Sequence, residues 1–381
     1  MHTPDEFAAA GVYDPSVPNA ASRLALLNWL IDEGFTLEQL AAARSGDRLD
    51  AISGGDMLLV PGPLRPMIDV VARTGLSAER IDAYTTALGV APLSFSPPGE
   101  IGLSDEEADA LTSLNAVGEA EGLFSGDELL SFLRVIGASI GRVADAALSL
   151  FLTDVESPHR KSGGDELVLT KKVFEAVSLI DGFMTTLDPL FRRFLVQAIE
   201  RSRLASISTQ ERLRYRYAVG FVDLVGFTEI SGVMSDAELS GFLRDFEGRA
   251  YDVVNTAGGH VVKLIGDEVM FVATNADAAC RAAAELVAGF GADGATVLPR
   301  GGIAYGEVLV RGGDYYGSVV NLASRLADQA VPQDILVTDL LAAAATSCAF
   351  APAGRRALKG FAEPVAVLSL VTEHTPRGIR T

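Results

Sequence analysis

Two aspartates stand beside glycine at the ends of apolar segments in the second half of the chain. Asp223 lies in FVDLVGFT (residues 221–228) and Asp267 lies in KLIGDE (residues 263–268). Paired carboxylates on rigid backbone are the ligands that Mg²⁺ or Mn²⁺ needs when a triphosphate supplies the remaining oxygens. An Asp-Glu pair after glycine is also common in hairpins, but its coincidence with FVDLVGFT favours a metal site. The pattern predicts a nucleotide-triphosphate enzyme.

The segment after Asp223 is expected to turn from a strand into the start of a helix. Backbone N–H groups at such a turn are natural partners for phosphate oxygens. We therefore assign Phe227 and Thr228 to substrate binding, and Leu224, the neighbour of Asp223, to the metal site.

Lysine is rare in the second half, where Lys263 and Lys359 stand against fifteen arginines. Lys263 lies within an apolar segment, which makes a purely solvated role less expected. An ammonium and a carboxylate, such as those of Lys263 and Asp314, match the N1 acceptor and the amine donor of adenine, whereas guanine reverses both. Sites built on such hydrogen bonds can reject a mispaired analogue by roughly 10⁴-fold. If both residues face the base, the substrate is ATP.

Composition and charge limit the classes of partner. The 381 residues carry a net charge of −19, of which residues 1–200 contribute −16 and residues 201–381 contribute −3. So acidic a first half is poorly suited to nucleic acid or to an anionic membrane. No uninterrupted apolar run reaches the ~18 residues of a membrane span. The N-terminus lacks the basic region of a secretory signal. The chain has two cysteines, which suits a reducing cytosol. We expect a cytoplasmic protein without a transmembrane segment.

The first half is expected to be helical throughout. Helical spacing and capping patterns occur at residues 21–34, from Thr36, from Ser104 with Glu107, and over residues 125–152, whereas the polar residues 157–165 are expected to form a loop. A helix-turn-helix is an alternative for residues 22–50, although ordinary helix packing is favoured because the second helix carries few basic side chains.

The junction is expected to be a helix that opens at Asp188-Pro189 and ends near Ala205, with proline at its first position. We divide the chain into a helical domain (residues 1–187), a coupling helix (188–210), a second domain (211–373) and a tail (374–381). The second domain alternates strands with helices, which predicts an α+β sandwich with a mostly antiparallel sheet.

Three separated motifs, FVDLVGFTEISG, GGHVVKLIGDEVMF and DYYGSVVNLASRL, resemble in order and spacing the catalytic domain of class III adenylate cyclases, over roughly residues 215–372. The resemblance implies a ferredoxin-like sandwich that binds two divalent ions, Mg²⁺ or Mn²⁺. It implies the following roles: metal ligands Asp223 and Asp267, adenine recognition by Lys263 and Asp314, ribose positioning by Asn321, transition-state stabilisation by Arg325 and, less securely, phosphate binding by Lys359, with Arg311 as a further phosphate candidate.

The same resemblance implies a homodimer, because the family takes its metal aspartates from one chain and its base, ribose and transition-state residues from the other. The expected reaction is ATP to cyclic AMP and pyrophosphate. A guanylate cyclase and a non-catalytic nucleotide sensor are the alternatives.

The first half resembles, more weakly, the helical regulatory domain of actinobacterial cyclases, some of them acid-responsive, which implies autoinhibition. The coupling helix contains no histidine, and the nearest ones are His159, expected in a loop, and His260. A lipid-like or other small ligand of the helical domain is an open alternative to acid.

Overall fold

The computed structural model describes residues 2–45, 59, 62–93, 96, 99–119, 125–161, 165–206, 214–290 and 297–372. The chain forms two compact units, Met1–Phe191 and Arg192–Thr381. The boundary falls inside one helix.

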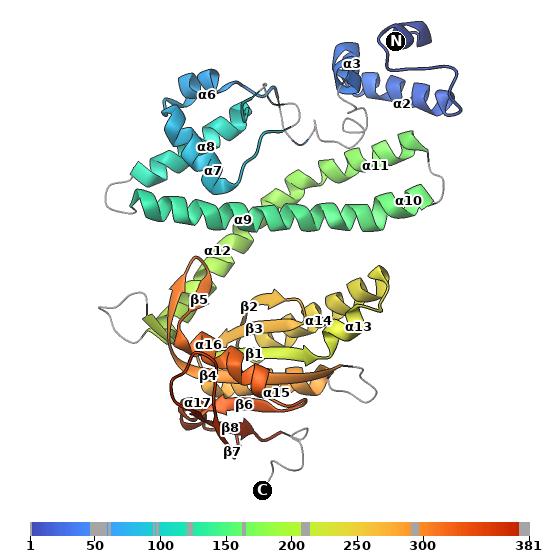
Figure 1. Cartoon of the computed structure of the whole chain (residues 1–381). Helices are drawn as coiled ribbons and strands as arrows, with labels where there is room; N and C mark the ends of the chain where they lie inside the picture. Colours follow the sequence, from blue (N-terminus) through green and yellow to red (C-terminus); the bar gives the residue numbers. More distant parts are fainter. Residues whose placement is uncertain are drawn as a thin grey trace. The chain divides into compact units, whose positions relative to one another are not determined.

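The described part of the first unit is helical, as predicted (Figure 1). Its helices are α1 (Pro4–Ala9), α2 (Ala20–Asp32), α3 (Leu37–Ser45), α6 (Met67–Thr74), α7 (Ala78–Leu88), α8 (Asp105–Glu119), α9 (Gly126–Phe151), the π-helix η1 (Leu152–Glu156), α10 (Ser157–Lys161), α11 (Glu166–Ser178) and the first part of α12 (Ile180–Ala205). The predicted capping box at Ser104 is confirmed, since Ser104 and Glu107 exchange hydrogen bonds at the start of α8.

Two small cores hold this unit together. One packs Phe7, Leu27, Leu30 and Leu40 against α11, and the other packs α6, α7 and α8 against the first turns of α9. Leu40 is fully buried, so α3 uses its apolar side for packing, as the ordinary-helix interpretation predicted; residues 46–50 of the helix-turn-helix alternative lie outside the described residues.

Two expectations in this unit are wrong. The helix α12 begins at Ile180 and not at Asp188, so Pro189 lies inside it. An interior proline removes one helical hydrogen bond but does not have to end a helix. Within the predicted loop 157–165, residues 157–161 form the helix α10, which continues directly from η1, and residues 162–164 lie outside the described residues. His159 therefore lies on a helix and is partly buried, with Nε2 2.9 Å from the backbone oxygen of Asp165.

Long stretches of α9 and α12 expose apolar side chains. Every residue from 141 to 150 of α9 is exposed, and Phe191 and Phe194 on α12 are 60% and 62% exposed. By length and composition, the helical stretch Gly126–His159 could cross a membrane. Arg142 and Asp145 lie in its apolar part, and a charge at the centre of a span costs about 2.5–3.5 kcal/mol. These two charges therefore oppose burial of α9 in lipid.

The second unit is built on an eight-stranded sheet. The strands are β1 (Arg214–Val225), β2 (His260–Ile265), β3 (Glu268–Ala273), β4 (Leu298–Arg311), β5 (Asp314–Tyr316), β6 (Ile335–Thr338), β7 (Phe350–Arg356) and β8 (Val365–Leu370). Their order is β2-β3-β1-β4-β6-β8-β7, with β5 paired to β4, and every pair is antiparallel except β4 with β6. The predicted α+β sandwich with a mostly antiparallel sheet is confirmed.

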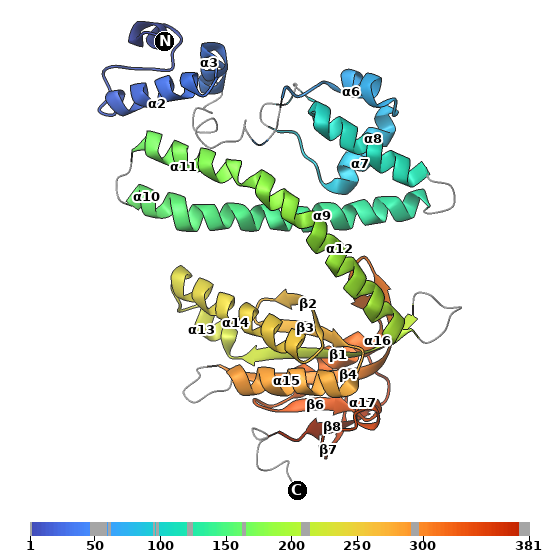
Figure 2. The same ribbon diagram turned by 180° about the vertical axis from the view of Figure 1, so that it is seen from behind.

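Helices cover both faces of the sheet (Figures 1 and 2). They are α13 (Phe227–Ser231), α14 (Asp236–Thr256), α15 (Ala276–Phe290), α16 (Ser318–Gln329) and α17 (Asp339–Ala344). Strand β1 alternates between the two cores: Ala218 and Val222 pack with α14 and α15, whereas Val219 and Phe221 pack with α16. This alternation is what a strand buried on both faces requires.

Candidate active site

The end of β1 carries the first metal-binding candidate in a row of charged residues. Strand register places Asp223 directly opposite Glu268 on β3 and opposite Arg300 on β4. Asp267 precedes Glu268 in the turn between β2 and β3, where Gly266 has a φ of 63°. That left-handed conformation favours glycine, so the residue before Asp267 lets the chain reverse tightly. The sheet therefore brings the two predicted metal aspartates together.

The acidic side chains at this end of the sheet disfavour one another's ionisation. Burial raises the pKa of Asp267, and the charge of Asp223 raises it further. Burial likewise raises the pKa of Glu268 to about 7, with added contributions from Asp223, Asp328 and Asp267. Arg300 lowers the pKa of both Asp267 and Glu268. A cation is thus favoured at this position.

Arg300 contacts the metal-binding candidate directly. Its Nε and Nη2 atoms donate to Oδ2 of Asp223 at 3.0 and 2.8 Å. Its Nη1 atom donates to the backbone oxygen of Asp328, in the last turn of α16, at 2.7 Å. Arg300 therefore joins β1 to the end of α16.

The predicted base-recognition residues also meet. Nζ of Lys263 on β2 donates to Oδ2 of Asp314 on β5 at 2.5 Å, and the backbone N–H of Tyr315 donates to Oδ1 of Asp314 at 2.8 Å. The two side chains are 40% and 29% exposed, so they are accessible and not sealed in a core. The pair presents a donor and an acceptor side by side, which is the complement of an adenine edge.

Asn321 and Arg325 lie one turn apart on α16, which the sequence spacing required. Nη1 of Arg325 donates to Oδ2 of Asp328 at 2.9 Å. The helix lies very close to β4: a Cβ atom added to Gly302 would stand 2.2 Å from the nitrogen of Ala327. Glycine at this position sets the height of α16 above the sheet.

The turn after Asp223 limits what its residues can offer. The side chain of Leu224 is 2% exposed and belongs to the core, so its backbone carbonyl is the group that could face an ion. Phe227 is buried and stacks on Phe242 with ring centroids 5.3 Å apart, which leaves its backbone N–H for a phosphate. Thr228 is exposed in α13.

The two phosphate candidates lie elsewhere on the sheet. Lys359 is exposed in the connection between β7 and β8, at the edge of the sheet opposite to β2. Arg311 is exposed at the end of β4 and pairs in register with Asp314.

The donor set fits hard divalent cations, which take oxygen ligands. Two aspartate carboxylates and the Leu224 carbonyl are such ligands. Among the described residues, no three acidic, histidine or cysteine side chains are arranged to hold an ion alone. Water and triphosphate oxygens would complete the coordination, as in the Mg²⁺ sites of nucleotide enzymes.

Sequence reasoning missed three residues of this arrangement: Arg300, Glu268 and Asp328. Arg300 and Glu268 reach Asp223 through strand pairing. The signal that could have found Arg300 is its place at the start of the glycine-rich strand RGGIAYG, once that strand is paired with FVDLVGFT.

Comparisons with known proteins find nucleotide cyclases among the relatives of this chain. The family "Adenylate and Guanylate cyclase catalytic domain" matches residues 215–368. The uncharacterised Mycobacterium tuberculosis protein Rv2212 is 31% identical over 96% of this chain and 93% of its own length. An adenylate cyclase of Streptomyces coelicolor is 31% identical over 70% of this chain and 67% of its own length. The crystal structure of the adenylyl cyclase CyaB from P. aeruginosa shares 26% identity, covering 42% of this chain and 95% of that one with a TM-score of 0.37.

Proposed function

Because the chain belongs to the class III adenylate cyclase family, we propose that it converts ATP to 3′,5′-cyclic AMP and pyrophosphate at a site shared by two copies. The observation that carries the proposal is the Lys263–Asp314 pair on the same sheet as the carboxylates Asp223 and Asp267. Both sets of residues are needed, because base recognition alone would bind a nucleotide without converting it to product.

The chain's own residues supply binding, orientation and charge. Asp223, Asp267 and the carbonyl of Leu224 would hold divalent ions, which when bound make the ribose 3′-hydroxyl more acidic and neutralise phosphate charge. Arg325 would give up Asp328 to stabilise charge that develops on the α-phosphate, and Asn321 would orient the ribose. The reaction needs no protein nucleophile, since positioning and electrostatics account for most phosphoryl-transfer catalysis.

Substrate choice follows from hydrogen bonding. To bind adenine, Lys263 must turn its ammonium toward N1 while Asp314 accepts from the exocyclic amine. Guanine would place a donor before Lys263 and an acceptor before Asp314, leaving both charged groups unsatisfied. This disfavours the alternative of a guanylate cyclase.

The apolar faces of α9 and α12 support the homodimer. Side chains such as Leu148, Leu150, Phe191 and Phe194 are 57–64% exposed in a single chain. Exposed apolar area of this extent marks an interaction surface. In a two-fold symmetric dimer the same surface is used by both subunits, so a second copy of the chain would cover these helices in both molecules.

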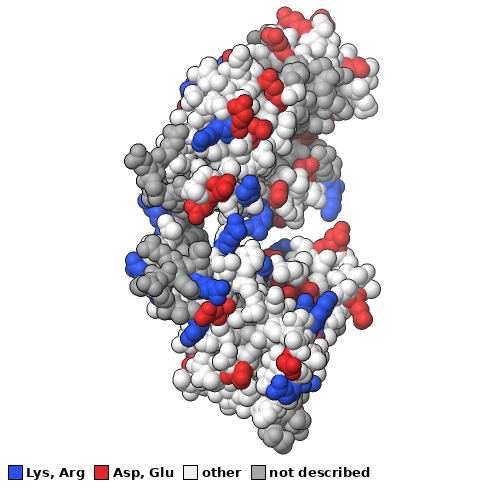
Figure 3. Space-filling view, turned by 60° about the vertical axis from the view of Figure 1, so that its left-hand side comes forward, with Lys and Arg blue, Asp and Glu red and all other residues white. Residues whose placement is uncertain are grey.

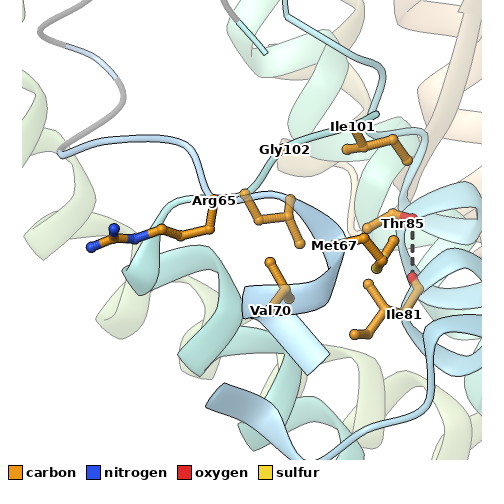
Figure 4. Close-up of a pocket in the computed structure, with 8 residues that line it drawn as sticks. Arg65, Met67, Val70, Ile81, Thr85, Ile101 and Gly102 are labelled. Atoms are coloured by element: carbon orange, nitrogen blue, oxygen red, sulfur yellow. Dashed lines mark hydrogen bonds between the residues drawn. The ribbon is translucent and has the colours of Figure 1, made fainter. Parts of the chain in front are cut away.

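Regulation by the helical unit is part of the proposal. The last turns of α12 belong to the second unit, where Ala205 is buried with Tyr217 and Val219. A continuous helix that ends in this core can pass on a change at its other end. The pocket of the first unit between α6, α7 and residues 101–103 has room for about 10 Å³, and Arg65 directs its guanidinium away from it (Figure 4). This pocket is too small to enclose a lipid.

The purified full chain, supplied with Mn²⁺ and ATP, is expected to form cyclic AMP, and Asp223→Asn is expected to lower the rate at least 100-fold by weakening metal binding. GTP should compete poorly with ATP. Chromatographic detection of cyclic AMP and cyclic GMP measures both, and equal turnover of GTP would exclude the proposed role of Lys263 and Asp314. Full inactivity of the unaltered chain at every pH, together with inactivity of residues 192–381, would exclude the cyclase.

A further inference from the structure

Arg300 already holds the carboxylate to which a metal would bind. Two of its nitrogen atoms donate to the same oxygen, Oδ2 of Asp223, at 3.0 and 2.8 Å. The side chains of Arg300 and Asp223 are 24% and 21% exposed, so water screens this ion pair only in part. A third nitrogen donates to the backbone oxygen of Asp328. All three guanidinium nitrogens of Arg300 therefore donate hydrogen bonds, two to Asp223 and one to Asp328.

This arrangement conflicts with a divalent ion at the same oxygen. A guanidinium keeps its charge at any physiological pH, so it cannot be neutralised when a second cation arrives. Mg²⁺ binds carboxylate oxygens at about 2.0–2.1 Å, which would bring the ion within a few ångströms of the guanidinium. Repulsion at that distance opposes simultaneous binding.

The end of α16 offers Arg300 a second anchor. The last carbonyls of a helix lack helical partners and carry partial negative charge, so they favour a nearby cation. The bond from Nη1 to the oxygen of Asp328 uses such a carbonyl, in a helix that ends at Gln329. Arg300 can therefore leave Asp223 without leaving the site.

We propose that Arg300 is a resident counter-cation of the Asp223 carboxylate, and that a divalent ion coordinates Oδ2 of Asp223 only by displacing Arg300 from this oxygen. The proposal rests on the proposed function, because it takes Asp223 as a metal ligand. Arg300 acts here as a positioning residue: it holds the carboxylate in place without metal and lowers the affinity of the free protein for the metal.

Mn²⁺ binding to the full chain without nucleotide tests the proposal, with electron paramagnetic resonance measuring free Mn²⁺. Arg300→Gln is expected to bind Mn²⁺ about tenfold more tightly than the unaltered chain, because a unit charge beside the ion is removed. Arg300→Lys keeps the charge and should stay within about threefold. The control Arg216→Gln removes an exposed arginine of β1, seven residues before Asp223 on the same strand. It should change the dissociation constant for Mn²⁺ less than twofold.

The outcomes separate this proposal from the proposed function. Equal or weaker Mn²⁺ binding by Arg300→Gln, with binding abolished by Asp223→Asn, would overturn the role of Arg300 and leave the metal site intact. Binding that Asp223→Asn does not reduce would overturn the metal site itself.

A second measurement does not depend on the folding of a glutamine variant. In the unaltered chain labelled with ¹⁵N-arginine, the Nε–H signal of Arg300, assigned from its absence in Arg300→Lys, should shift as Mg²⁺ saturates the site. A signal that stays unchanged at saturation would mean that Arg300 keeps its bond to Asp223, and would overturn the displacement.

Discussion

At the scale of single residues, His260 shows how burial prepares a side chain to respond to acid. It begins β2, and burial together with the positive charge of Arg201 on α12 lowers its pKa to about 4. The unfolded chain binds a proton at His260 near pH 6.5, whereas the folded chain does not until about pH 4. The folded state therefore has the full benefit of neutral His260 above pH 6.5 and loses it as the pH falls from 6.5 to 4.

Replacing His260 with glutamine should remove this acid sensitivity. Between pH 7 and pH 4.5, the unaltered chain should lose about 1–2 kcal/mol more stability than His260→Gln, less than the pKa difference alone implies because His260 is partly exposed. Urea unfolding at both pH values measures the difference. Parallel losses in the two proteins would contradict the prediction, and His159→Gln, partly buried on α10, serves as the control.

At the scale of elements, the contact between α16 and β4 positions two catalytic candidates at once. An added Cβ at Gly302 would meet the backbone of Ala327 at 2.2 Å and of Ala323 at 2.3 Å. Gly302→Ala must therefore push α16 away from the sheet, together with Asn321 and Arg325. We expect a loss of about 1–3 kcal/mol of stability from overpacking and a fall in kcat of about 100-fold from misplacement.

The neighbouring glycine provides a matched control. A Cβ at Gly301 would approach no atom closer than 3.3 Å, so Gly301→Ala requires shifts of only a few tenths of an ångström. It should keep most of the activity. Thermal unfolding and initial rates of cyclic AMP formation compare the two variants, and equal effects would show that the height of α16 does not matter.

Local patterns in the sequence predicted most elements, because caps and apolar spacing act within a few residues. The capping box of Ser104 and Glu107 begins α8 as expected, and the strands around Asp223 and Gly266 lie where the motifs placed them. The bond between Arg300 and Asp223 spans 77 residues and exists through the pairing of β1 with β4. A pattern within a few residues cannot show which residues of β1 and β4 pair with each other. The start of α12 was missed because proline was taken as a first residue.

At the scale of the whole molecule, charge and apolar exposure describe the surface. Acidic and basic side chains are interspersed over the face drawn in Figure 3, in a chain with a net charge of −19. Electrostatic attraction to nucleic acid needs a continuous basic surface, and the described residues on this face form none.

Shared sites predict rescue between two inactive chains. Asp223→Ala removes a metal ligand and Arg325→Ala removes the transition-state arginine, so neither homodimer has an intact site. In random mixtures half of the dimers are mixed and each has one intact site of two, which gives about a quarter of the unaltered activity. Native mass spectrometry confirms that mixed dimers form. Inactivity of a mixture that contains them would place each whole site within one chain.

Pro189 lies two residues before the last residue of the first unit, within a helix that continues into the second. The proline ring has no backbone N–H, so this turn of α12 lacks one helical hydrogen bond. The helix therefore bends more easily near the boundary between the two units than along an uninterrupted turn. Pro189 thus places a point of lower stiffness in the helix that joins the first unit to the second, and an alanine there would stiffen this helix without changing either unit.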